Sequence, residues 1–257
     1  MIDSHCHLTY PELGSQIPAV LQRAAAAGVR ECVTIATDMD DARKALDLSA
    51  QFPNVHVVCG IHPHQAGKVE AGWDAALTAL VRREDVHAVG EMGLDYHYDF
   101  SDRESQQRVF ARQLEIAAEV KKPVVIHCRE AHTDVLNSLA GCQGIPNVVF
   151  HCFTGSESEA NEILERGYWI SLTGVVTFKR SGELRRVAAM IPEDRLMIET
   201  DSPYLSPEPV RNARPNEPSY LPHTARCIAA ARGINLETLI TITEANTRRF
   251  YHLPVPQ

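Results

Sequence analysis

Short runs of apolar, mostly β-branched residues alternate with longer amphipathic segments along the whole chain, and this alternation constrains the fold most strongly. Alternating strands and helices favour parallel βαβ units. Eight runs are expected to be strands, which are residues 2–4, 31–36, 55–60, 86–90, 123–127, 147–151, 168–172 and 195–199. An open doubly wound sheet usually has fewer strands. The pattern therefore predicts an α/β fold, a single (β/α)8 TIM barrel, for which a length of 257 residues is typical.

The segments between these runs are rich in Ala and Leu and are expected to be helices. They cover residues 17–27, 42–51, 73–83, 103–120, 131–139, 157–166 and 182–190. A Pro-rich stretch, 202–222, follows the last strand and is expected to be an ordered loop, with two further helices near 222–232 and 236–246. No linker is long enough to separate domains, so residues 1–257 are expected to form one hydrolase domain.

Charge and composition restrict the class of protein. A formal net charge of −8 argues against a protein that coats nucleic acid, which would need a basic face. It does not exclude a phosphodiester substrate, because bound divalent cations add local positive charge. No apolar run approaches the roughly 20 residues that span a bilayer, and we see no secretion signal. The seven cysteines are scattered and are expected to be reduced. We expect a cytoplasmic monomer that does not bind membranes.

Histidines and acids recur where the expected strands end. His5 and His7 have one residue between them, so that they point the same way from one strand. Other expected strands are followed by His62 and His64, Glu91, His127, His151 and Asp201. In a parallel barrel the carboxyl ends of all strands emerge on one face. Four imidazoles (His5, His7, His127, His151) and two carboxylates would converge there, which is enough for two divalent cations such as zinc or manganese.

Each of these residues also has a simpler interpretation when it is taken alone. A single histidine can be a loop residue, Glu91 an ion-pair partner, and Asp201 an N-cap. Six such residues at one end of a barrel favour a dinuclear metal site, with Glu91 central enough to bridge the ions. Its donors differ from those of structural zinc sites, which are closed and rich in thiolates. An open site can activate water, and Asp201 either accepts the proton of that water or acts only as a ligand.

Six motifs together resemble the TatD family of metal-dependent deoxyribonucleases, which belongs to the amidohydrolase superfamily of metal-containing (β/α)8 barrels. They are Ser4-His5-Cys6-His7, Gly60-Ile61-His62-Pro63, Gly90-Glu91-Met92-Gly93-Leu94-Asp95, Ile126-His127-Cys128-Arg129, His151-Cys152-Phe153-Thr154-Gly155 and Glu199-Thr200-Asp201-Ser202-Pro203-Tyr204. The resemblance implies that one ion is held by His5, His7, Glu91 and Asp201, and the other by Glu91, His127 and His151. It also implies exonucleolytic hydrolysis of DNA with Mg2+, Mn2+ or Zn2+.

Candidate substrate contacts lie beside these ligands. Arg129 either binds a phosphate as a bidentate fork or pairs with Glu130 or Asp134. His62 contacts a phosphate or leaving group, or makes a structural hydrogen bond. Tyr204 either stacks on a base or packs within its loop.

The function predicted from the sequence is that of a metal-dependent hydrolase. It would cleave phosphodiester bonds of DNA, at ends or in single strands, by metal-activated water, with Glu91 and Asp201 as catalytic residues. The alternative within the same superfamily is a small-molecule amide, lactone or phosphoester hydrolase. A non-catalytic binding scaffold is disfavoured, because such a protein has no need for an open dinuclear site.

Overall fold

The computed structural model describes residues 1–98 and 100–254, and in these ranges eight strands alternate with helices. The strands are β1 (Ile2–Cys6), β2 (Glu31–Ile35), β3 (Val55–Cys59), β4 (Val86–Asp95), β5 (Val124–Arg129), β6 (Val148–Phe150), β7 (Trp169–Leu172) and β8 (Leu196–Ile198). They follow one another in chain order in a single sheet, and the pairs with known register are parallel. Strand β8 also lies beside β1. The predicted (β/α)8 barrel fold is confirmed.

The expected helices are all present, and short 3-10 helices occur in several loops. The α-helices are α1 (Pro11–Gly14), α2 (Ile17–Ala26), α3 (Met39–Gln51), α4 (Trp73–Val81), α5 (Arg103–Val120), α6 (His132–Ala140), α7 (Glu157–Glu165), α8 (Gly182–Met190), α9 (Leu221–Arg232) and α10 (Leu236–Tyr251). The 3-10 helices are η1 (Pro63–Lys68), η2 (Gly174–Thr177), η3 (Glu193–Arg195) and η4 (Pro218–Tyr220). Helices α3, α5, α7 and α10 begin at a side chain that caps them: the Asp38 carboxylate, for example, accepts hydrogen bonds from the backbone N–H groups of Asp40 and Asp41.

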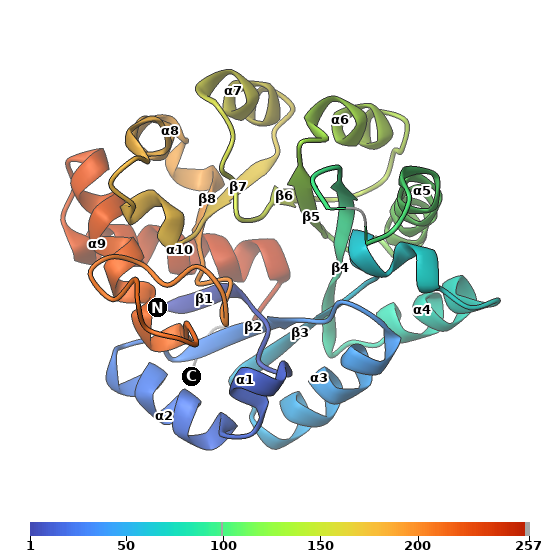
Figure 1. The fold of residues 1–257 in the computed structure, drawn as a ribbon, viewed down its shortest axis with the longest axis horizontal. Coiled ribbons are helices and arrows are strands. Elements are labelled where there is room, and N and C mark those ends of the chain that lie inside the picture. The colour runs from blue at the N-terminus through green and yellow to red at the C-terminus, as the bar shows by residue number, and fades with distance from the viewer. Residues whose placement is uncertain (99, 255–257) are drawn as a thin grey trace. The chain divides into compact units, whose positions relative to one another are not determined.

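The described chain divides into two compact units, and the first comprises residues 1–34 and 152–254. It contains β1, β7, β8 and most of β2, with α10 packed on β8 and β1 and α8 packed on α9 (Figure 1). The hydroxyl of Tyr251, on α10, donates to the backbone oxygen of Ser4 at 3.1 Å. The C-terminal helix therefore supports the strand that contains His5.

The second unit comprises residues 35–151, with β3 to β6 and α3 to α6 (Figure 1). Helix α5 packs on β4, and α3 packs on β3. The buried amide of Gln113, on α5, donates to the Ile61 oxygen at 3.0 Å and accepts from the Ile61 N–H at 2.7 Å. This pair of bonds fixes the segment after β3, where His62 lies.

Strand β4 is longer than the sequence indicated. It was expected at 86–90, with Glu91 at its end, but it runs on to Asp95, so Glu91 lies inside the strand. Gly90 and Gly93 allow β4 to approach β5 closely: a Cβ at Gly90 would lie 2.6 Å from the Val125 oxygen, and one at Gly93 only 1.9 Å from the His127 oxygen. Both glycines also have positive φ angles, of 147° and 142°.

Two further expectations concern the chain as a whole. Within the described ranges, every helix is too short or too polar to cross a bilayer. All seven cysteines lie in these ranges and none forms a disulfide. That residues 1–257 form one domain stays a prediction.

Two groups of candidate metal ligands

The first group lies in the first unit, where β1 meets the segment after β8. The Asp201 N–H donates to the His5 oxygen at 3.0 Å, and the His7 N–H donates to the Ser202 oxygen at 2.7 Å. These bonds bring three predicted ligands together. The Nε2 atoms of His5 and His7 are 3.4 Å apart, and Asp201 Oδ1 lies 3.8 Å from the first and 3.5 Å from the second. Candidate donor atoms of all three residues lie within 4.8 Å of one another.

Buried polar neighbours hold this group in place. Asp3 is fully buried, and its carboxylate accepts from the Thr200 N–H at 2.9 Å and from the Thr200 hydroxyl at 2.5 Å. Burial raises the pKa of Asp3 to about 7, although the hydrogen bonds from Thr200 lower it. The Asn216 amide donates to the Thr200 oxygen at 3.0 Å. The turn that presents Asp201, whose own φ is 54°, is therefore held from two sides.

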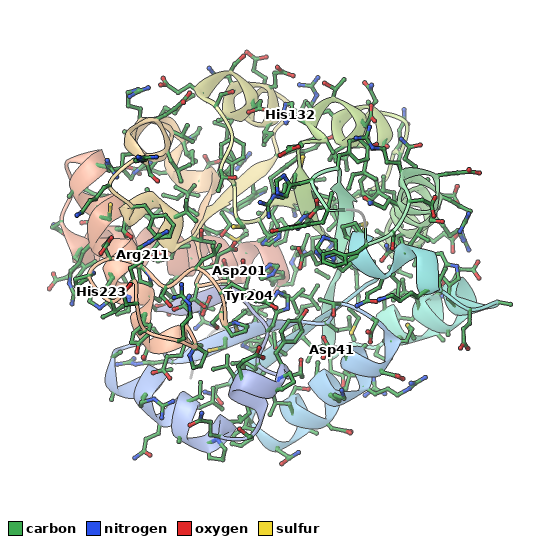
Figure 2. The ribbon with its side chains drawn as sticks, in the orientation of Figure 1. Asp41, His132, Asp201, Tyr204, Arg211 and His223 are labelled. Carbon is green, nitrogen blue, oxygen red and sulfur yellow. The ribbon has the colours of Figure 1, made fainter. Side chains whose placement is uncertain are left out.

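Tyr204 follows Asp201 on the same turn, and both side chains are labelled in Figure 2. The Tyr204 N–H donates to the Asp201 oxygen at 2.9 Å. The ring of Tyr204 is half exposed and meets Tyr10 edge to face at 6.1 Å, while Tyr10 stacks on His7 at 4.8 Å. An aromatic surface thus borders the first group, and base stacking by Tyr204 stays a prediction.

The second group lies in the second unit and is centred on Glu91. Its Oε1 atom lies 2.6 Å from His151 Nε2, 2.9 Å from His127 Nδ1 and 3.4 Å from His62 Nε2. These histidines come from the ends of β6, β5 and β3, while Glu91 projects from β4. The carboxylate is almost completely buried. Four strands of this unit therefore contribute to one polar cluster, as the strand-end pattern predicted.

The charges in the second group suit cation binding. Burial alone would raise the pKa of Glu91, but the imidazoles of His151 and His62 and the hydrogen bonds from His127 and His151 lower it well below its usual value. Burial lowers the pKa of His62 to about 4, so this imidazole is neutral at physiological pH; its Nδ1 accepts from the His64 N–H at 3.0 Å, and its Nε2 proton faces Glu91. Burial lowers the pKa of His127, but its hydrogen bonds to Asp95 and Glu91 raise it above its usual value, so that a cation bound at Nδ1 would displace a proton. Carboxylate and imidazole are donors that divalent transition metals prefer.

Asp95, the last residue of β4, supports this group, and its role was not predicted. Its Oδ2 atom accepts from His64 Nε2 at 2.8 Å and from His127 Nε2 at 3.0 Å. Burial opposes ionisation, but these hydrogen bonds hold the pKa of Asp95 well below its usual value. Because residues i, i+2 and i+4 of a strand share a face, Asp95 stands on the same face as Glu91. The interval of four residues between Glu91 and Asp95 was visible in the sequence, but it places both on one face only if β4 continues to Asp95.

Two predicted substrate contacts also lie in the second unit. His62 belongs to the ligand group, since its donor atom lies within 4.8 Å of those of Glu91 and His127. Arg129 is the exposed last residue of β5, with its guanidinium 4.7 Å from the centre of the Tyr98 ring.

The two acids considered as partners of Arg129 have other partners. Glu130 accepts from His97 Nδ1 at 2.7 Å, and Asp134 accepts from the Tyr96 hydroxyl at 2.7 Å. This arrangement favours the phosphate interpretation of Arg129.

Both groups fit a divalent cation. In the first, two imidazole nitrogens and a carboxylate oxygen, all potential donors of lone pairs, face one another within 4 Å. In the second, three imidazoles surround one buried carboxylate oxygen. A structural zinc site would be built from thiolates in a closed tetrahedron. The histidine and carboxylate donors here are instead typical of catalytic sites.

Comparison with known proteins shows relatives along almost the entire chain. A family model described as "TatD related DNase" matches residues 2–252. The chain is 37% identical over 258 residues to a protein of Salmonella typhimurium named "3'-5' ssDNA/RNA exonuclease TatD", covering 98% of this chain and 99% of the relative. It is 36% identical to an Escherichia coli protein named "Uncharacterized metal-dependent hydrolase YcfH", covering 98% and 96% of the two chains.

Solved structures show the same fold. The crystal structure of YJJV, a TatD homolog from Escherichia coli, matches with a TM-score of 0.93 and 29% identity, covering 99% of this chain and 98% of the other. A Burkholderia multivorans amidohydrolase with bound zinc matches with a TM-score of 0.67 at 14% identity, covering 98% and 99% of the two chains. At that identity the second match indicates the fold alone.

Proposed function

Because this chain belongs to the family of TatD-related DNases, we propose that it removes nucleotides from the 3′ end of single-stranded nucleic acid. It is a metal-dependent nuclease that hydrolyses ester bonds. The observation that supports the proposal most strongly is the buried Glu91 carboxylate with three imidazole nitrogens within 3.4 Å. The direction of digestion comes from the names of the relatives, which act on single-stranded DNA and RNA.

The enzyme depends on divalent metal, and we propose two ions of Mg2+, Mn2+ or Zn2+. One would be held by His5, His7 and Asp201, and the other by Glu91, His127 and His151. Bound divalent cations supply Lewis acidity toward a phosphoryl oxygen and lower the pKa of water. That Glu91 is also a ligand of the first ion stays a prediction.

Side chains of this protein would transfer the proton of the attacking water and bind the phosphate of the substrate. Asp201, whose side chain is partly exposed, would accept the proton of the attacking water in addition to its role as a ligand. Arg129 offers a planar fork of N–H donors to a phosphate of the substrate. His62 is neutral because of its lowered pKa, and its Nδ1 accepts from the His64 N–H, so its Nε2 proton is available for a phosphate or leaving oxygen.

A small-molecule hydrolase, the alternative from the sequence, is not favoured. Curated relatives at 37–39% identity over 98% of the chain are named as exonucleases on nucleic acid. We also propose a cytoplasmic location, since seven cysteines without a disulfide suit a reducing compartment. The monomeric state stays a prediction that light scattering on the purified protein would test.

A nuclease assay tests the proposed function. Purified protein with Mn2+ or Mg2+ should shorten a single-stranded oligonucleotide from its 3′ end, and Glu91→Ala should lose this activity by at least a hundredfold. Glu165→Ala, at an exposed position on α7, is the matched control and should digest like the wild type. Wild-type-like digestion by Glu91→Ala would contradict the proposal.

A further inference from the structure

Two adjacent aromatic rings are exposed between β4 and α5. The strongly exposed large hydrophobic side chains of the described residues are Tyr98, Phe100 and Tyr204, and two of these lie on this one segment. Tyr98 is 40% and Phe100 is 62% exposed, and their ring centroids are 5.5 Å apart. Aromatic side chains normally gain stability by burial. A pair of neighbouring rings held in solvent therefore indicates a binding surface.

The backbone that leads to Tyr98 is held by hydrogen bonds. Asp95 Oδ1 accepts from the N–H groups of His97 and Tyr98, both at 3.0 Å. The Tyr96 N–H donates to the Arg129 oxygen at 2.9 Å, which ties the segment to β5. Because these bonds already hold residues 96–98, a ligand that stacks on Tyr98 loses little affinity to the ordering of that part of the loop.

The exposed rings adjoin the second ligand group. The Phe100 ring lies 4.7 Å from the ring of His64, and the neighbouring Ser101 hydroxyl donates to the His64 oxygen at 3.0 Å. His64 shares Asp95 with His127, the candidate ligand. A short chain of contacts therefore leads from the exposed rings to the group where hydrolysis is proposed.

A cation stands beside the rings. Arg129 places its guanidinium 4.7 Å from the Tyr98 ring centroid. It follows His127 by two residues on β5 and so points from the same side of that strand. Because the guanidinium covers one face of Tyr98, the more exposed ring of Phe100 offers the larger free aromatic surface, and a positive charge near it matches the repeating unit of a nucleic acid strand, in which each base adjoins a phosphate.

The charge of the whole protein strengthens this inference. At a net charge of −8, long-range attraction cannot draw a polyanionic strand to the enzyme. Stacking does not depend on net charge and is worth about 5- to 150-fold in affinity per base. An acidic nuclease can therefore hold its substrate through aromatic contacts and a few local cations.

We propose that Tyr98 and Phe100 form a stacking platform for unpaired bases near the 3′ end of the substrate, with Arg129 contacting the adjoining phosphate. The inference rests on the proposed exonuclease function and adds to it a subsite that selects single strands. Bases in a duplex are already stacked on their neighbours and cannot lie on these rings without unpairing.

A substrate with one missing base tests the platform. A single abasic nucleotide is placed at each of the six positions nearest the 3′ end, and kcat/KM is measured for the wild type, Tyr98→Ala and Phe100→Ala. We expect the wild type to lose about 5- to 150-fold when the base that occupies the platform is missing. On the intact oligonucleotide, kcat/KM of Phe100→Ala should be lower than that of the wild type by a similar factor. The abasic nucleotide at the platform position should not lower kcat/KM of this variant further. Phe100→Trp should restore stacking.

The controls separate stacking from folding. Phe52→Leu changes a half-buried aromatic residue before β3, at the opposite end of that strand from His62, and should leave kcat/KM unchanged. Thermal melting of each variant confirms that it folds. If the abasic substrate lowers kcat/KM of Phe100→Ala by the same factor as that of the wild type, the two losses are independent and the proposal is overturned. It is also overturned if Phe100→Ala has the kcat/KM of the wild type on the intact oligonucleotide.

Two other results would also overturn the platform, and they are distinguishable. If Phe100→Ala converts a dimer into a monomer in sedimentation while kcat/KM is unchanged, the rings bind a second copy of the chain instead. If the wild type digests no oligonucleotide with any of the three metals, the proposed function fails together with the platform. Normal digestion by both wild type and variant rejects the platform alone.

Discussion

Replacing Asp95 by asparagine should weaken metal binding without unfolding the protein. In the structure, Asp95 Oδ2 accepts from His127 Nε2 at 3.0 Å, and His127 Nδ1 lies 2.9 Å from Glu91 Oε1. The Nε2 proton points to Asp95 and stays there, so that a cation held with Glu91 would take the place of the proton on Nδ1. An asparagine amide that turns its NH2 group to Nε2 would favour the opposite tautomer, with a proton on Nδ1.

The size of this effect follows from the geometry. His127 is one of three proposed ligands of its ion, and Asp95 orients it through one charge-assisted hydrogen bond. Loss of such an outer partner typically weakens metal affinity by about 10- to 100-fold, which corresponds to about 1.4–2.7 kcal/mol. Asparagine keeps an oxygen for the N–H groups of His97 and Tyr98, so the loop should remain ordered.

Calorimetric titration of Mn2+ into the metal-free protein measures the effect directly. Asp134→Asn is the matched control, because Asp134 bonds to the Tyr96 hydroxyl, away from His127. We expect a 10- to 100-fold higher Kd for Asp95→Asn and an unchanged Kd for the control. An Asp95→Asn protein that binds Mn2+ as tightly as the wild type would refute the orienting role of Asp95.

Three other predictions concern stability and metal dependence. Gly93→Ala should destabilise the protein by about 3 kcal/mol or more in urea titration, because its Cβ would lie 1.9 Å from the His127 oxygen at a φ of 142°. Gly182→Ala, where nothing lies within 4 Å of the new Cβ, should be near neutral, and equal costs would contradict the close approach of β4 and β5. Arg23→Ala should cost about 1–3 kcal/mol at pH 7, because it leaves the buried Glu217 carboxylate without the guanidinium that now bonds both of its oxygens. Burial raises the pKa of Glu217, but Arg23 and Ser219 lower it below its usual value. The stabilisation that Arg23 gives the folded protein is therefore complete above about pH 4.5 and is lost as the pH falls through the lowered pKa. Denaturant titrations at pH 7 and pH 3 should show this difference shrinking, and a constant difference would refute it. Dialysis against EDTA should abolish nuclease activity and lower Tm, and Mn2+ should restore both; full activity after dialysis would contradict metal dependence.

Much of the site was predictable from spacing along the chain. The alternation of strands with helices gives parallel strands, whose carboxyl ends share an edge, and this places His127, His151 and Asp201 at or just after the ends of their strands without any coordinates. The interval of two residues between His5 and His7 was enough to predict that both imidazoles lie together, and their Nε2 atoms are 3.4 Å apart.

The rest could not be predicted from local patterns, because it depends on contacts between strands. Gly90 and Gly93 are usual signals of a strand end, yet here they allow β4 to continue against β5. Only this longer strand places Asp95 behind His127. Likewise, nothing local indicates that Tyr98 and Phe100 stay exposed, since aromatic residues more often lie in the core.

Anomalous diffraction from crystals grown with Mn2+ is the most direct measurement of the central claim, that both groups bind cations. We expect one peak at about 2.0–2.3 Å from donor atoms of His5, His7 and Asp201, and a second at this distance from donor atoms of Glu91, His127 and His151. Crystals of Glu91→Ala should lose the second peak. Maps without a peak at either group, from active protein at saturating Mn2+, would contradict the claim.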